Sequence, residues 1–224
     1  MNNEQIDILN TNKSEYCYEQ IKKMIISNEL PGGSFLVERQ LSAMLGFSRT
    51  TIRHALQELV KDNLVTSYPN RGMVVTPITI EDVIEIYQIR ESLDVLALRL
   101  YLSKQDREMR IAQLQSHLDS MRESLESSDH KLYIEQDLAF HSCYLKDTGN
   151  GRLETILHSL WNQMSHIILS VTSISRLYDS QKEHEYMMEA LHKGDIDGAC
   201  NILQQHIRLS KAYHIERMTG ISLI

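Results

Sequence analysis

The chain has 224 residues, and its 23 Lys and Arg residues against 30 Asp and Glu residues give a formal net charge of −7. A hydrophobic content of 42% suffices for a packed core, and only three Pro and nine Gly residues argue against disorder and turn-rich all-β folds. Three widely spaced cysteines exclude a disulfide framework or a local metal-ligand pair and favour a reducing compartment. The first 16 residues have neither the basic region nor the apolar stretch of a signal peptide, so we do not expect one there. No run approaches the roughly 18 apolar residues of a membrane span. We therefore expect a soluble cytoplasmic protein with no membrane partner.

Charge is distributed unevenly along the chain. Residues 1–78 carry eight basic and eight acidic side chains, so everything after residue 78 accounts for the net charge of −7. Between residues 39 and 71, five basic side chains stand against two acidic ones. Two domains with different electrostatic roles are the simplest interpretation, and Pro77-Ile78-Thr79 is the only plausible boundary. We place the domains at residues 10–77 and 78–224.

The first domain reads as three helices followed by a hairpin. Apolar residues recur at helical spacing in residues 13–28, 38–45 and 49–62. Ser48 can cap the third helix by accepting a hydrogen bond from a free N–H group in its first turn. Two β-type runs, residues 64–68 and 73–76, flank a Pro-Asn-Arg-Gly turn and predict a hairpin. This order of elements is that of a winged helix-turn-helix.

The second domain reads as helical throughout. Proline is absent after Ile80, and Gly194 is placed to end a helix. The predicted helices cover about 80–102, 104–126, 130–147, 151–173, 176–192 and 195–217. The fold class is therefore mainly α, with an N-terminal winged helix-turn-helix and a C-terminal all-α bundle of about six helices.

The start of the third predicted helix carries side chains suited to DNA. Arg49 and Arg53 lie one turn apart, opposite the apolar face, and the planar guanidinium group of arginine can bond guanine O6 and N7 together. Hydroxyl groups and free N–H groups at a helix start suit phosphates. Single arginines on a helix are usually only solvated, but a cluster of hydroxyl and arginine side chains followed by a wing favours double-stranded DNA as the partner. The residues expected to contact DNA are Arg39, Ser48, Arg49, Thr50, Thr51, Arg53, Arg71 and Gly72.

Residues 25–76 resemble the winged-helix domain of the GntR family of bacterial transcriptional regulators. The matching motifs are Pro-Gly after the first helix, Glu-Arg at the start of the second, SRTT-x-R-x-AL-x-x-L, and Asn-x-Gly in the wing. The resemblance implies that Arg39, Arg49 and Arg53 read operator bases, with Ser48, Thr50 and Gly72 at the backbone or the minor groove. Two positions depart from the family pattern: His54 replaces a residue that is usually acidic, and Val37 stands where a capping Ser or Thr is common.

Nine of the ten histidines follow residue 78, and three of them each lie on the apolar face of a different predicted helix. Asp137 and His141 are four residues apart and project from one face, while His184 and His206 each lie on an apolar stripe. A lone histidine in such a place is more often a hydrogen-bonded core residue. Three imidazoles and a carboxylate buried together, however, require a common partner. A divalent metal ion satisfies this, with zinc or nickel first and manganese as a possibility.

Residues 80–215 resemble the FCD ligand-binding domain of the FadR branch of the same family, in its VanR-like subgroup. The motifs are DLAFH, EHEYMMEAL and ILQQHI. The resemblance implies that Asp137, His141, His184 and His206 bind a metal and leave positions open for an effector carboxylate or water.

Two further residues are candidates for effector binding, Arg90 and His166. Arg90 in YQIRESLD matches a recurrent arginine of the first helix of this domain, which implies a contact with the effector or with a neighbouring helix. A salt bridge on the helix surface is an equally good interpretation. His166 shares a polar stripe, for which a solvated face is the simpler reading. His192 suits a helix C-terminus. The remaining histidines expected to face solvent are His117, His130, His158 and His214.

These features favour a repressor, not an enzyme, whose operator affinity is controlled by a small carboxylate effector. Because two DNA-binding heads must meet a pseudo-palindromic operator, we expect a homodimer. One alternative keeps the DNA-binding head and makes the metal purely structural. Another is a metal-dependent hydrolase, but Glu183 and Glu185 are expected to point around the helix and away from the metal ligands, which leaves no general base beside them.

Overall fold

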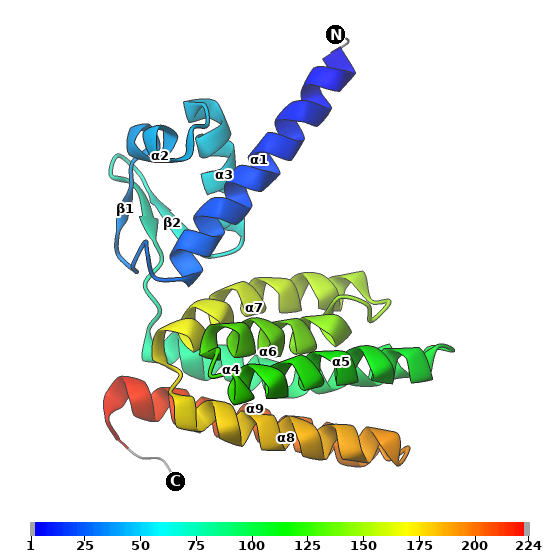
Figure 1. Ribbon diagram of the computed structural model, residues 1–224. Helices are drawn as coiled ribbons and strands as arrows, with labels where there is room; N and C mark the ends of the chain where they lie inside the picture. The colour runs from blue at the N-terminus through cyan, green and yellow to red at the C-terminus, as the bar shows by residue number, and fades with distance from the viewer. Residues whose placement is uncertain (1–2, 222–224) are drawn as a thin grey trace. The chain divides into compact units, whose positions relative to one another are not determined.

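The computed structural model describes residues 3–221, apart from the side chains of residues 3–12, 166 and 169–171. The chain divides into two compact units, with the boundary between Ile78 and Thr79. Figure 1 shows a first unit that combines helices with a small sheet and a second unit built from helices. Within the described range, none of the helices has the length and apolar character needed to cross a bilayer.

The first unit is a winged helix-turn-helix, as predicted. Its elements are α1 (Asn3–Ile26), β1 (Phe35–Leu36), α2 (Glu38–Leu45), α3 (Arg49–Lys61), β2 (Val65–Tyr68) and β3 (Gly72–Val75). Strand β3 lies between β1 and β2 and pairs antiparallel with both. Helix α1 begins well before residue 13, and β1 was missed because two residues are too short to show an alternating pattern. Helices α1 and α3 pack together over buried Ile21, Ile25, Ile52 and Leu56.

Local chemistry fixes the tight turn between α2 and α3. Gly46 ends α2 with φ of 74°, a left-handed conformation that favours glycine. Ser48 caps α3 as predicted, because its hydroxyl accepts a hydrogen bond from the backbone N–H of Thr51 at 3.1 Å. Val37 at the start of α2 provides no such bond. The N-terminus of α3 is therefore capped, and Arg49 and Thr50 in its first turn are exposed while Ile52 is buried.

The second unit contains six helices in its described part, in agreement with the prediction. They are α4 (Ile80–Leu102), α5 (Arg107–Glu126), α6 (His130–Leu145), α7 (Gly151–Val171), α8 (Ile174–His192) and α9 (Ile196–Thr219). Helix α4 packs against α5, α6, α7 and α9, so it forms the centre of the bundle, while α8 packs against α5, α6 and α9. The predicted bounds agree to within about three residues, the usual uncertainty of helix ends.

Capping motifs define the ends of helices that carry the candidate site. Thr79 and Asp82 form a capping box at the start of α4, with the Asp82 N–H donating to the Thr79 hydroxyl at 3.1 Å. Between α8 and α9, Gly194 takes φ of 78° and its N–H donates to the Leu191 carbonyl at 3.0 Å. Gly194 therefore follows the end of α8, as predicted, and α8 and α9 pack side by side.

Candidate functional sites

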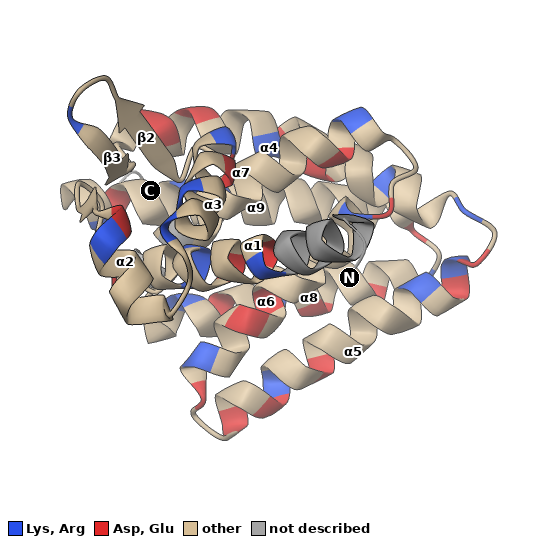
Figure 2. Cartoon of the chain, turned by 90° about the horizontal axis from the view of Figure 1, so that it is seen from above, with Lys and Arg blue, Asp and Glu red and all other residues tan. Residues whose placement is uncertain are grey.

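The residues expected to contact DNA lie on the surface of the first unit. Figure 2 shows Lys and Arg on α2, on α3 and at the tip of the β2–β3 hairpin. Among these residues only Thr51 is half-buried, and its hydroxyl lies 2.8 Å from that of Ser48. The other seven residues are exposed: Arg39, Ser48, Arg49, Thr50, Arg53, Arg71 and Gly72.

Two of these arginines share one carboxylate, which the sequence did not reveal. Arg53 donates from Nε and Nη2 to the two carboxylate oxygens of Glu38, at 2.7 and 2.8 Å. Arg49 Nη2 lies 3.8 Å from the same group. The hydrogen bonds from Arg53 lower the pKa of Glu38, so the carboxylate stays charged. The Glu-Arg motif at the start of α2 thus contributes an anion directly beside the expected reading arginines.

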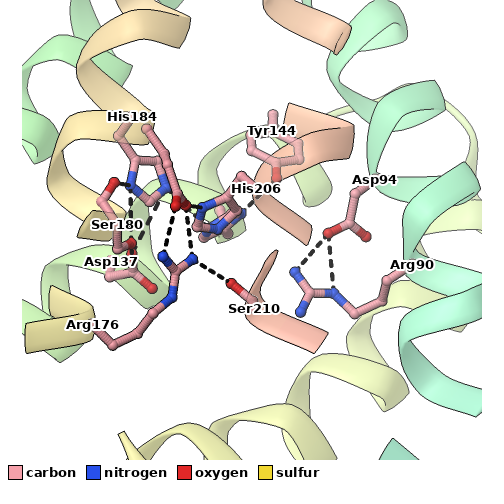
Figure 3. Close-up of polar contacts among 11 residues, drawn as sticks. Arg90, Asp94, Asp137, Tyr144, Arg176, Ser180, His184, His206 and Ser210 are labelled. Carbon is pink, nitrogen blue, oxygen red and sulfur yellow. Dashed lines mark hydrogen bonds and ion pairs between the residues drawn. The ribbon is translucent and has the colours of Figure 1, made fainter. Parts of the chain in front are cut away.

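Three imidazoles converge in the second unit. Ring nitrogens of His141 on α6, His184 on α8 and His206 on α9 all lie within 4.8 Å of one another. Nε2 of His141 and Nε2 of His184 are 3.2 Å apart. Asp137 lies at the edge of the group, with Oδ1 3.8 Å from Nε2 of His184 and 3.3 Å from the Ser180 hydroxyl that donates to it. The structure therefore brings together the four residues named from the sequence. Figure 3 labels three of them, Asp137, His184 and His206.

The second nitrogen of each ring has its own partner. Nδ1 of His184 is 2.8 Å from the Ser180 carbonyl, and Nδ1 of His206 is 2.6 Å from Oε2 of Glu183. Both partners can only accept, so Nδ1 carries the proton in both rings and Nε2 carries a lone pair. Nδ1 of His141 bonds the Tyr144 hydroxyl at 2.7 Å. Partners of this kind fix ring orientation in metal sites.

The electrostatics of the cluster fit a cation. Burial, with the neighbouring imidazoles, lowers the pKa of His141 and of His206 well below the ordinary value, so these rings are neutral. Burial raises the pKa of Asp137, because its negative charge lacks full compensation. The Nε2 atoms of His141 and His184 are 3.2 Å apart, a separation that two ligands of one ion can adopt. Without an ion, the Tyr144 hydroxyl can donate to Nδ1 of His141, and Nε2–H of His141 then donates to Nε2 of His184. The donor set of three neutral imidazoles and one carboxylate matches zinc and similar divalent ions.

Glu183 corrects one expectation. The sequence placed it around the helix and away from the metal ligands, whereas its carboxylate contacts His206. Arg176 donates to both Glu183 oxygens at 2.7 Å and to the Ser210 hydroxyl at 2.9 Å (Figure 3). The arginine therefore holds the carboxylate that orients His206. Arg176 was not named from the sequence, and Glu183 was named only as a residue that points away, although Arg176, Ser180 and Glu183 follow helical spacing along α8.

Arg90 lies inside the bundle and not in a surface salt bridge. It is 3% exposed and donates from Nη2 to Asp94 at 2.8 Å. Its guanidinium carbon stacks 4.1 Å from the ring centroid of Trp161. Arg90 lines a cavity next to the histidine cluster, together with Asp137, Arg176 and other side chains of the second unit. The side chain of the other effector candidate, His166, lies outside the described residues.

His214 corrects a second expectation. It was assigned to solvent, but it is 3% exposed, lines the same cavity and bonds the Tyr87 hydroxyl through Nδ1 at 2.7 Å. Burial lowers its pKa to about 3, so the ring is neutral. His117, also assigned to solvent, is half-buried and bonds the Gln136 side chain at 3.0 Å. The spacing that places Tyr133, Asp137 and His141 on one face of α6 would also have identified Tyr133 as a residue that lines the cavity.

Two family models match the chain, one for each unit. The FCD domain matches residues 85–209, and the bacterial regulatory proteins of the gntR family match residues 13–75. The chain belongs to the GntR family of bacterial transcriptional regulators, with an FCD domain after the winged helix. This GntR-family regulator is not an enzyme, and the hydrolase alternative falls because the family and the relatives that match it are regulators.

Relatives match both units of the regulator. It is 30% identical over 193 residues to the uncharacterized transcriptional regulator YdhC of Bacillus subtilis, covering 85% of this chain and 84% of the relative. It is 26% identical to a probable D-xylose utilization operon transcriptional repressor of Paenarthrobacter nicotinovorans, covering 82% and 80%. The solved structure of Escherichia coli McbR/YncC has the same fold, with a TM-score of 0.80 at 21% identity over 92% of this chain and 99% of that chain.

Proposed function

We propose that this regulator is a homodimeric repressor whose affinity for a pseudo-palindromic operator is controlled by a small organic acid bound at a divalent metal ion in the FCD domain. The observation that carries the proposal is the convergence of three neutral, buried imidazoles whose second nitrogens are already bonded. A relative described as a probable repressor supports the direction of control. Zinc or nickel is the first choice of ion, with manganese next.

His141, His184 and His206 would hold the ion, with Asp137 as the fourth ligand. When bound, the ion supplies a positive charge that attracts a carboxylate oxygen of the effector. The protein's part is to keep the three rings neutral by burial and to fix their direction through Ser180, Glu183 and Tyr144. The same cavity wall contains Arg90 of α4, and α4 follows the winged unit directly in the chain. We therefore propose that effector binding shifts α4 and that this shift is transmitted along the chain to the DNA-binding unit.

In the DNA-binding unit, Arg49 and Arg53 would read base edges in the major groove from the start of α3. Arg39 would support them from α2, and the hydroxyl groups of Ser48, Thr50 and Thr51 would contact the backbone. Arg71 and Gly72 at the hairpin tip would lie along the minor groove. Their exposure and the fixed N-terminus of α3 support this assignment. A dimer follows from the two half-sites of a pseudo-palindromic operator.

The test is DNA binding by the full-length protein, measured by fluorescence anisotropy on the promoter region beside its own gene. Arg49→Ala should abolish binding while circular dichroism shows an intact fold. His184→Ala should remove the metal, detected by elemental analysis, and abolish the response to small carboxylates. A coupling free energy of typical size corresponds to a change in operator affinity of about 5- to 150-fold. If metal-free protein folds and responds normally to an acid, the metal is structural at most and the proposed control is wrong.

Glu183→Gln tests the metal site without removing a ligand. The neutral amide weakens the hydrogen bond that orients His206, so we expect the affinity for zinc to fall by about 10- to 100-fold. Competition with a chromophoric chelator measures this directly. Glu185→Gln is the matched control, because Glu185 lies two residues away on α8 and bonds Arg122 and Gln181 instead. Equal zinc affinity in the two variants would contradict the role given to Glu183.

A further inference from the structure

Two polar residues of α3, His54 and Gln57, are exposed but are not among the expected DNA contacts. The buried side of this helix consists of four residues that follow helical spacing: Ile52, Ala55, Leu56 and Leu59. Since each residue turns an α-helix by about 100°, His54 and Gln57 lie on the side opposite to these four. Both side chains therefore meet any molecule that approaches the outward side of α3.

Each of the two residues continues a row of expected DNA contacts. Gln57 lies four residues after Arg53, just as Arg53 lies four residues after Arg49. In the adjacent row, His54 lies four residues after Thr50. Residues four apart are neighbours on the surface of a helix. His54 and Gln57 therefore extend the two rows toward the C-terminus of α3.

The charges beside His54 and Gln57 are compatible with a polyanion. Glu58 is the one acidic residue in the sequence of α3, and it pairs with Lys61 at 2.7 Å. The carboxylate of Glu38 accepts two hydrogen bonds from Arg53. Among the residues that the structure describes, none forms a side-chain hydrogen bond or ion pair with His54 or Gln57. Their polar atoms are therefore open to contacts with a ligand.

The spacing of the two residues suits stacked base pairs. They are three positions apart, which is about 4.5 Å along the helix axis, and successive base pairs are about 3.4 Å apart. A helix in the major groove can thus direct the two side chains at neighbouring base pairs. A glutamine amide donates to N7 of adenine and accepts from N6. An imidazole N–H donates to N7 or O6 of guanine, which are both acceptors.

Building on the operator binding proposed above, we propose that His54 and Gln57 read two neighbouring base pairs in each half-site, Gln57 an adenine and His54 a guanine. These contacts add sequence preference beyond that of Arg49 and Arg53. The reading surface of α3 then extends from Arg49 to Gln57, about 12 Å along the axis or three to four base-pair steps. The adenine and the guanine lie beside the base pairs that the arginines contact.

Selection from a pool of random-sequence duplexes tests this with the full chain and requires no known operator. The parent chain, His54→Ala and Gln57→Ala are each incubated with the pool, and the bound duplexes are sequenced. For the parent we expect adenine and guanine at adjacent positions of each half-site. The adenine should be preferred by about 5- to 150-fold, as for a bidentate contact, and the guanine by about fivefold, as for one hydrogen bond.

Each variant should lose one of these two preferences. Gln57→Ala should reduce the preference for adenine to less than about twofold, and His54→Ala should do so for guanine, while all other positions stay as in the parent. Alanine favours helix, so both variants should keep α3, which circular dichroism verifies. Glu58→Ala is the matched control, because Glu58 is exposed on the same helix and contacts Lys61. It should change no base preference, whatever its effect on overall affinity.

Two results overturn the inference. One is a full set of parental base preferences in both His54→Ala and Gln57→Ala. The other is a uniform loss of affinity for all sequences, which would mean that the two side chains contact phosphates instead of bases. If Arg49→Ala abolishes selection while these two variants select as the parent does, the proposed operator binding stands and only the inference is wrong. If the parent chain selects no sequence at all, both are wrong.

Discussion

Glu38 is an acidic residue in the middle of a surface that is expected to meet a polyanion. Its carboxylate binds Arg53 through two hydrogen bonds and lies 3.8 Å from Arg49. Such a pair fixes the direction of the Arg53 guanidinium group and leaves its remaining edge free for a base. The carboxylate also repels phosphate, which disfavours DNA that offers no compensating base contacts. Glu38 therefore serves specificity at the expense of affinity.

Replacing Glu38 by Gln should reverse this balance. Without the negative charge, affinity for random DNA should rise severalfold and its salt dependence should steepen, because more phosphate contact is possible. Affinity for the operator should rise less or fall, since Arg53 loses its fixed orientation. Anisotropy titrations with operator DNA and with random DNA, at several salt concentrations, give the ratio of the two affinities. Glu58→Gln is the control, as Glu58 pairs with Lys61 at the far end of α3. An unchanged ratio of operator to random affinity in Glu38→Gln would refute the specificity role.

The residues of the histidine cluster and its surroundings differ in how far the sequence could predict them. Asp137, His141, His184 and His206 were found because each interrupts an apolar stripe, and helical spacing alone predicts a common interior face. Glu183 lies one position before His184, which turns its Cα away by about 100°. Its long side chain nevertheless reaches His206 on α9. Contacts of this kind depend on the distance between two helices, which the spacing within one helix does not contain.

At the scale of elements, helices were predicted better than strands or helix starts. A periodic pattern of twenty residues averages over errors, and α4 was predicted to the residue for that reason. Strand β1 has two residues and exists because Phe35 and Leu36 pair with Val74 and Met73 of β3. The strand therefore depends on a contact with a distant segment, which the pattern of residues within β1 does not reveal. Helix caps lie between these cases, since Ser48 could be recognised from its side chain alone.

The start of α2 offers a test of capping in the same unit. Val37 occupies the capping position with extended backbone angles of φ −89° and ψ 112°, but it has no side chain that can accept a hydrogen bond. Val37→Ser should therefore raise the free energy of unfolding by about 0.5–1 kcal/mol. Ser48→Ala removes the existing cap of α3 and should lower it by about 1 kcal/mol. Chemical denaturation followed by circular dichroism measures both. A loss of stability in Val37→Ser would mean that the exposed valine contributes more through packing than the cap restores.

At the scale of the whole molecule, the two units bury different kinds of residue. Among the described residues, every buried polar or charged side chain belongs to the second unit, including His141, His184, His206 and His214. The first unit instead has an apolar core and keeps its charges on the surface. Composition by segment predicted the division of charge, but not that so many ionisable groups of the bundle would be buried. His214 is the clearest case, because its partner Tyr87 lies 127 positions earlier in the chain.

Buried neutral histidines make the second unit sensitive to acid. The pKa of His214 is about 3 in the folded protein, below the ordinary value of 6.5, because burial disfavours its charged form. Unfolded chains therefore bind a proton that the folded chain excludes. The stabilisation is complete above about pH 6.5 and is lost as the pH falls toward 3, at up to about 1.4 kcal/mol per pH unit. Trp161 reports unfolding of this unit by fluorescence, since it is the single tryptophan of the chain.

Replacing His214 by Gln should remove one of the groups that bind a proton on unfolding, and so weaken the pH dependence of the free energy of unfolding. Denaturation of chelator-treated protein at pH 7.5, 6.0 and 5.0 should therefore give a shallower decline of the free energy of unfolding in the variant than in the parent chain. The variant should also start from a lower value at pH 7.5, because the hydrogen bond from Tyr87 is altered. His54→Gln provides the control, as His54 is exposed in the first unit and lies far from the reporter in the sequence. Parallel curves for the parent and His214→Gln would show that His214 takes up its proton without unfolding, and that the acid sensitivity of the bundle has another source.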